Sequence, residues 1–143
     1  MLTGRDKGID MAENSRNYSL VLKKGGRVLF RSRQRGLRPL VRCVARFSGR
    51  LEKAVLEDKV VGMAAARLIS FSGMISRVEA GAISEEALGY LLRGGIEARG
   101  GPWTKGKSCR WERLAADCPD DRLFFALLVE EFGLSPKRQA PDS

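Results

Sequence analysis

Short strand-like and helix-like segments alternate along the middle of this chain, and the alternation limits the folds open to it. KAVLED, RVEAGAI and IEAR are expected to be strands, while residues 60–73 and the segment SEEALGYLLRGG are expected to be helices. Strands separated by helices form a mostly parallel sheet, and helices usually cover both faces of such a sheet. The pattern therefore predicts an α/β domain.

Further elements are expected on either side of this region. YSLVLKK and RVLFRS read as two strands, and Gly25 and Gly26 between them reach positive φ without strain, which favours a hairpin. A helix should follow from Gly36 onward, because apolar residues recur there at three- and four-residue spacing. DDRLFFALLVEEFG is expected to be a C-terminal helix that ends at Gly133.

Length and composition fit one small domain. The chain has 143 residues, of which 43% are hydrophobic, enough for a core. We expect a flexible N-terminal segment over 1–17, a single domain over 18–133 and a disordered tail over 134–143. The first residues carry charges and no apolar stretch, and the longest apolar run is interrupted by Arg67. Three cysteines without framework spacing fit a reducing compartment, so the sequence predicts a cytoplasmic protein with no membrane partner.

The chain contains no histidine. This excludes a Ser-His-Asp triad, a Cys-His dyad and an HExxH zinc site. Any proton transfer near neutral pH would have to use a carboxylate, lysine or cysteine with a shifted pKa. Whether the protein is an enzyme is therefore left open.

Positive charge is concentrated in one segment. The net charge is +9, and residues 18–50 contain ten basic and no acidic residues. Four of these arginines recur every fourth residue, opposite the apolar stripe of the expected helix: Arg38, Arg42, Arg46 and Arg50.

This arginine face has two interpretations. It can bind phosphates of a nucleic acid or an acidic protein, or it can be a solvated helix face that keeps a small domain soluble. No aromatic residues alternate with the arginines, so the sequence gives no sign of base stacking.

Two strand-to-helix junctions suggest a binding site. Asp58 and Lys59 end one expected strand, and Ser84 and Glu85 follow the next. Asp58 and Ser84 stand where helix N-caps belong. In open α/β sheets, ligands bind beyond the carboxyl ends of the strands, so these four residues should surround one crevice. Gly62 is included in the site because its lack of a side chain lets the helix that follows it lie close to the sheet or to a neighbouring helix.

The same residues carry a resemblance to a known family. LEDKVVGMAAARLISFSG followed by ISEEALGYLLRGGIEA resembles the uncharacterised prokaryotic domain-of-unknown-function family numbered eighteen-ninety-three (DUF1893). The start of the helix expected from Gly36 onward, with Gly36, Pro39 and Leu40, is similar to that family as well. CRWERLAADCPDD resembles its Cys-Pro-x-Glu element, with Cys109 and Glu112 retained.

This resemblance implies a fold and argues against one chemistry. The fold would be a three-layer α/β/α sandwich with a mixed five-stranded sheet, similar to the cytidine deaminases. Zinc deaminases hold their metal with His and Cys ligands at two helix starts, and neither junction here offers such a ligand. We therefore expect no metal and no cofactor.

Three interpretations of the crevice stay open. It can bind a small anionic or nucleotide-like ligand through Lys59 and the two helix N-termini. It can be an enzyme in which Lys59 or Cys109 is the nucleophile and Asp58 or Glu85 moves protons. Alternatively, Asp58 and Ser84 only cap helices and the protein acts through its surface.

Overall fold

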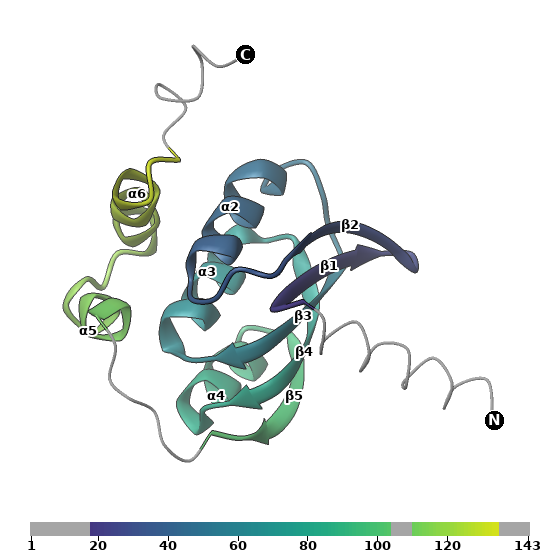
Figure 1. Cartoon of the computed structure of the whole chain (residues 1–143). Coiled ribbons are helices and arrows are strands. Elements are labelled where there is room, and N and C mark those ends of the chain that lie inside the picture. Colours follow the sequence, from purple (N-terminus) through teal and green to yellow (C-terminus); the bar gives the residue numbers. More distant parts are fainter. Residues whose placement is uncertain (1–17, 104–109, 135–143) are drawn as a thin grey trace, which may run out of the picture.

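The computed structural model describes residues 18–103 and 110–134, which form an α/β fold (Figure 1). The strands are β1 (Leu20–Lys24), β2 (Arg27–Ser32), β3 (Ala54–Val61), β4 (Ile75–Ile83) and β5 (Glu97–Pro102). The helices are α2 (Arg38–Phe47), α3 (Met63–Ser72), α4 (Glu85–Arg93), α5 (Arg110–Asp117) and α6 (Asp121–Glu131). The expected hairpin, the strand–helix alternation and the C-terminal helix are confirmed, whereas α5 was not expected.

The five strands form a single mixed sheet in the order β2-β1-β3-β4-β5. β1 runs antiparallel to both β2 and β3, while β3, β4 and β5 are parallel. Gly25 and Gly26 form the hairpin turn with φ of 58° and 82°. Both values belong to the left-handed region that a two-residue turn between twisted strands requires. The predicted α/β fold with a mixed five-stranded sheet is confirmed.

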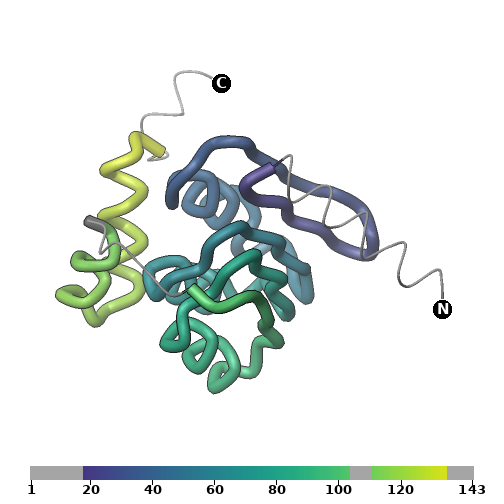
Figure 2. The backbone as a smooth tube through the Cα atoms, turned by 60° about the horizontal axis from the view of Figure 1, so that its bottom comes forward, coloured from purple at the N-terminus to yellow at the C-terminus, as the bar shows by residue number. Residues whose placement is uncertain are grey.

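The described helices lie on one side of this sheet. β3–α3–β4 and β4–α4–β5 connect neighbouring parallel strands, and such connections are almost always right-handed, so α3 and α4 lie on the same face. α2 packs beside α3, and α5 and α6 form an outer layer against α3 (Figure 2). The second helical layer of the expected α/β/α sandwich is not seen within residues 18–103 and 110–134.

The core lies between the sheet and the inner helices. Leu22, Leu56 and Val78 project from three neighbouring strands and are completely buried. α3 lies at the centre and is buried nearly all round, as the sequence predicts. Most of its residues are small or apolar, such as Ala64 and Ala66, so neighbouring elements can pack closely around it. No helix in the described part of the chain is long and apolar enough to cross a membrane.

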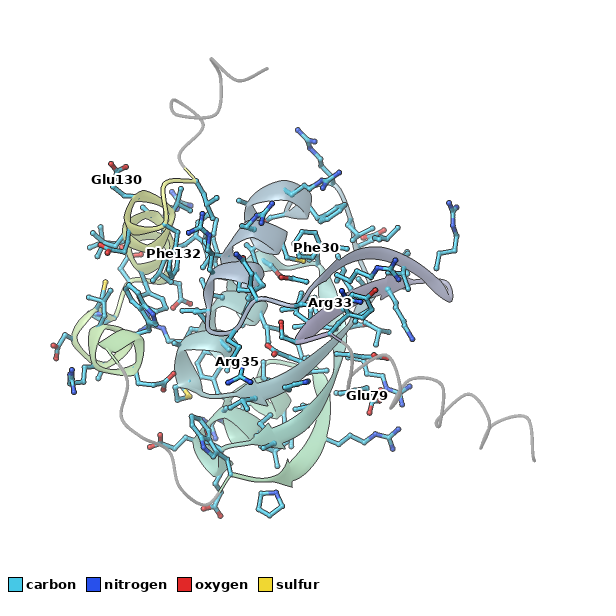
Figure 3. All side chains as sticks on the ribbon, viewed as in Figure 1. Phe30, Arg33, Arg35, Glu79, Glu130 and Phe132 are labelled. Carbon is cyan, nitrogen blue, oxygen red and sulfur yellow. The ribbon has the colours of Figure 1, made fainter. Side chains whose placement is uncertain are left out.

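The opposite face of the sheet carries paired charges. Lys23 Nζ lies 3.1 Å from Oε2 of the buried Glu57. Glu79 joins two arginines, with Oε2 2.6 Å from Arg77 Nε and Oε1 2.8 Å from Arg99 Nε. Figure 3 shows Glu79 on the side of the sheet away from α5 and α6. This face therefore carries ion pairs beside the buried Val21.

Candidate functional site

The junction between β3 and α3 differs from the sequence prediction. β3 continues to Val61, which pairs with Ile83 of β4, and the helix begins only afterwards. Asp58 therefore lies inside the strand, and Gly62 is the N-cap of α3. The prediction that Asp58 caps this helix is wrong.

Asp58 has a desolvated carboxyl group close to Cys43 of α2. Asp58 is half-buried as a residue, and burial of its carboxyl group raises the pKa from its ordinary 3.8 to about 8, although the nearby backbone N–H groups of Val60 and Lys59 lower it. Burial also raises the pKa of the Cys43 thiol to about 12; nearby Arg46 lowers it and Asp58 raises it further. Both groups are largely neutral at pH 7.

The N-terminus of α3 is capped by a side chain from α5. Glu112 Oε1 accepts a hydrogen bond from the N–H of Met63 at 3.1 Å, and Oε2 accepts one from Ala64 at 3.0 Å. The first N–H groups of a helix have no partner within it and carry partial positive charge, so a carboxylate binds them strongly. Glu112 thus satisfies the donors that Asp58 was expected to satisfy.

Gly62 is needed for this contact because of crowding. A Cβ atom on Gly62 would lie 2.7 Å from Cζ3 of Trp103 and 2.9 Å from Oε2 of Glu112. Both distances are shorter than van der Waals contact. Any larger residue at position 62 would push the Glu112 carboxylate away from the helix.

The start of α4 follows the prediction more closely. Ser84 is its N-cap, and the Ser84 hydroxyl accepts a hydrogen bond from the N–H of Ala87 at 3.1 Å. Glu85 and Glu86 are exposed in the first turn, where negative charge is favourable. Both helix N-termini are therefore satisfied by groups of the protein itself.

A cavity of ≈ 610 Å³ lies beside these two helix starts, between α3, α4 and α5. We call it the strand-end crevice, because α3 and α4 follow the carboxyl ends of β3 and β4. Of the residues predicted to bind a ligand, Glu85 lines it, and Gly62 adjoins its wall through Met63. Asp58, Lys59 and Ser84 are not part of the wall. The lining residues are Met63, Arg67, Glu85, Glu86, Gly89, Arg93, Glu112, Ala115 and Ala116.

Arg67 connects the crevice to the outer helices. Its Nε donates to Oδ1 of Asp121 at 2.7 Å, and its Nη1 donates to the carbonyl oxygen of Ala115. Its guanidinium carbon lies 4.8 Å from the ring centre of Phe124. The side chain is 8% exposed, and Nη2 is buried without a hydrogen-bond partner among the residues that the structure describes. The sequence analysis did not assign Arg67 to the site. A single charged residue in an otherwise apolar helix could have indicated that it makes specific polar contacts.

The candidate catalytic residues do not come together in the described structure. Lys59 is exposed on β3, whereas the Asp58 carboxyl group is desolvated near α2. Cys109 lies outside the described residues. The arrangement therefore gives no support to a nucleophile assisted by a neighbouring base.

The arginine face borders a second hollow, of ≈ 420 Å³. Arg42, Arg46 and Arg50 line it, whereas Arg38 does not. Phe30 of β2 and Leu134, which follows α6, complete its wall, and Figure 3 shows Phe30 between the hairpin and α2. The sequence did not indicate Phe30 or Leu134 because they come from elements far from the arginines along the chain.

Comparison with known proteins places the chain in a family. The sequence profile of the Domain of unknown function (DUF1893) matches residues 11–131. The chain belongs to this family. A crystal structure of a DUF1893 family protein from Thermotoga maritima is similar to this DUF1893 domain, with a TM-score of 0.70 and 26% sequence identity over 88% of each chain. No curated protein matches it.

Removing the Glu112 carboxylate should destabilise the DUF1893 domain. Glu112→Ala leaves the N–H groups of Met63 and Ala64 without their acceptor, so we expect a loss of about 2 kcal/mol in the free energy of unfolding. Urea unfolding measures this loss. Asp117→Ala, on the same helix and exposed, is the matched control and should change stability little. Equal stability of the two variants would contradict the capping role.

The Asp58 carboxyl group should make the domain less stable as pH rises. Its pKa is about 8 in the folded state, above its ordinary 3.8, so the folded state holds a proton that the unfolded state releases at lower pH. The free energy of unfolding should therefore fall between about pH 4 and pH 8. Asp58→Asn should remove this decrease and be more stable than the native protein at pH 8. Urea titrations across this range test it, and identical slopes would show that Asp58 ionises normally.

Proposed function

We propose that this DUF1893 domain binds a small nucleotide-like ligand in the strand-end crevice. The volume of ≈ 610 Å³ falls within the range of small-molecule sites. Its position supports the proposal as well, because open α/β sheets bind their ligands beyond the carboxyl ends of parallel strands.

One buried donor carries this proposal. Arg67 forms part of the crevice wall, and its Nη2 has no hydrogen-bond partner within residues 18–103 and 110–134. Nearly all buried polar groups in proteins have a partner, and leaving a charged donor without one is costly. Nη2 is itself shielded from solvent, so a carbonyl, carboxylate or phosphate oxygen of a ligand would satisfy it once the side chains that cover it move aside. Arg93, in the same wall, would add a second cationic donor.

The acidic residues favour a ligand that also donates hydrogen bonds. Glu85 and Glu86 are exposed in the crevice wall, and the Glu112 carboxylate already occupies the α3 N-terminus, where a free anion would otherwise bind. A simple anion would meet three carboxylates. A nucleotide-like molecule offers both amino groups for the carboxylates and acceptor oxygens for the arginines, so it suits this mixture better.

A fold similar to the cytidine deaminases, which the family resemblance implies, would suit such a ligand but brings no reaction. Zinc prefers thiolate and imidazole ligands, and the chain has no histidine. The crevice wall, as far as the described residues form it, offers carboxylates, and both oxygens of Glu112 already accept hydrogen bonds from α3. In this part of the chain, no three potential ligands come together to hold a metal ion. We therefore propose binding and no zinc-dependent step.

Titration with cytidine 5′-monophosphate, followed by the amide NMR signals of the labelled protein, tests the proposal. Signals of Met63, Glu85 and Gly89 should shift, while those of the distant β1–β2 turn should not. Arg93→Gln with Glu85→Gln should weaken binding about tenfold or more, because each removes a charge-assisted contact. The matched control Arg113→Gln with Glu97→Gln makes the same charge changes on exposed residues outside the crevice.

Two results would contradict this function. One is the absence of any shift at the crevice for cytidine, its monophosphate and other nucleotides at millimolar concentration. The other is equal weakening by the crevice variants and by the control pair, since binding would then depend on overall charge and not on this cavity.

A further inference from the structure

The hollow beside α2 combines positive charge with an apolar wall. We call it the arginine groove and define it by Phe30, Arg42, Ala45, Arg46, Arg50 and Leu134. The three arginines are exposed. No salt bridge joins any of them to an acidic residue of the described chain, and no acid lines the groove. Their charge is therefore available to a partner.

The spacing of the arginines suits a chain of phosphates. Arg42 and Arg46 are one helical turn apart on α2, a rise of about 6 Å along the helix axis. Arg50, beyond the end of the helix, lines the same hollow, and residues 18–50 contain no acid among them. A row of cations on one face binds a phosphate backbone by neutralising successive charges and releasing counterions.

Phe30 gives the groove an aromatic surface. The ring is half-buried and lies edge-on to Phe47, with ring centres 6.3 Å apart and an angle of 79° between the planes. Arg46 has its guanidinium carbon 5.3 Å from the centre of the Phe47 ring, so one arginine of the groove contacts the aromatic pair. Proteins that bind single strands combine these two features, since bases stack on aromatic rings while cations hold the backbone.

The size of the groove distinguishes between nucleic-acid forms. A hollow of ≈ 420 Å³ can receive one or two unpaired nucleotides but cannot enclose a duplex, whose bases are stacked inside and out of reach of Phe30. We propose that the arginine groove binds single-stranded nucleic acid, with phosphates on Arg42, Arg46 and Arg50 and a base against Phe30. This activity is independent of the crevice ligand.

Fluorescence anisotropy with a labelled oligonucleotide of twelve deoxythymidines tests the proposal. Arg42→Glu with Arg46→Glu should weaken binding at least tenfold at low ionic strength. The plot of log affinity against log salt concentration should become shallower by about 1.4, which corresponds to two lost phosphate contacts on a single strand. Arg113→Glu with Arg122→Glu, exposed residues of α5 and α6, changes the net charge equally and should retain binding.

Phe30→Leu separates stacking from charge. Leucine keeps an apolar side chain against Phe47 but removes the aromatic surface. Binding should weaken about fivefold or more while the salt dependence stays unchanged, because no phosphate contact is lost. Circular dichroism and urea unfolding of every variant establish that the fold is retained. If a charge-reversed variant does not fold, Arg42→Gln with Arg46→Gln takes its place.

Three outcomes would overturn the inference. The first is equal loss of affinity in the groove pair and in the control pair. The second is tighter binding of the corresponding duplex than of the single strand. The third is displacement of the oligonucleotide by polyglutamate of the same charge at the same concentration, which would identify the groove as a site for an acidic protein.

Discussion

The arrangement of this domain depends on a carboxylate that holds a helix from outside it. Glu112 binds the first two free N–H groups of α3, and this contact fixes α5 against the central helix of the core. Arg67 makes a second connection, from the middle of α3 to Asp121 at the start of α6. α5 and α6 pack on helices, and buried apolar residues such as Phe124 and Leu128 join the core, so the polar contacts act together with this packing to position the outer layer. The crevice has its third wall only because α5 is held there.

The same contacts determine the chemistry that the crevice can offer. A helix N-terminus is a natural anion site, but at α3 the anion is already a side chain of the protein, and at α4 the Ser84 hydroxyl and two glutamates fill that role. The two arginines of the wall remain as donors. Arg67 is positioned by three contacts, so the orientation of its guanidinium group is fixed before any ligand arrives. Such preorganisation reduces the entropy lost on binding.

Local sequence patterns predicted the helices and strands, but they could not predict contacts between residues that are far apart in the sequence. The hairpin, the buried character of α3 and the Ser84 cap followed from turn residues, apolar spacing and the N-cap preference. Asp58 was misplaced because its own sequence resembles a cap, while pairing with β4 extends the strand past it. Glu112 caps a helix that begins 49 positions earlier, and Phe30 reaches the arginines from a different element. The periodicity of a single segment does not indicate such contacts, because they form only when the segments pack against each other.

The ion pairs on the face of the sheet opposite the described helices influence the long-range electrostatic potential of the molecule. Glu57 is paired with Lys23, and Glu79 with both Arg77 and Arg99, so that region contributes little long-range potential. Residues 51–143 are nearly neutral as a whole, with thirteen basic and fourteen acidic residues. In residues 18–50, by contrast, every charged residue is basic. The domain is therefore an electric dipole whose positive end is the hairpin and α2. A polyanion would exert a torque on it and turn that end forward before the two surfaces touch, so that most encounters begin in a suitable orientation.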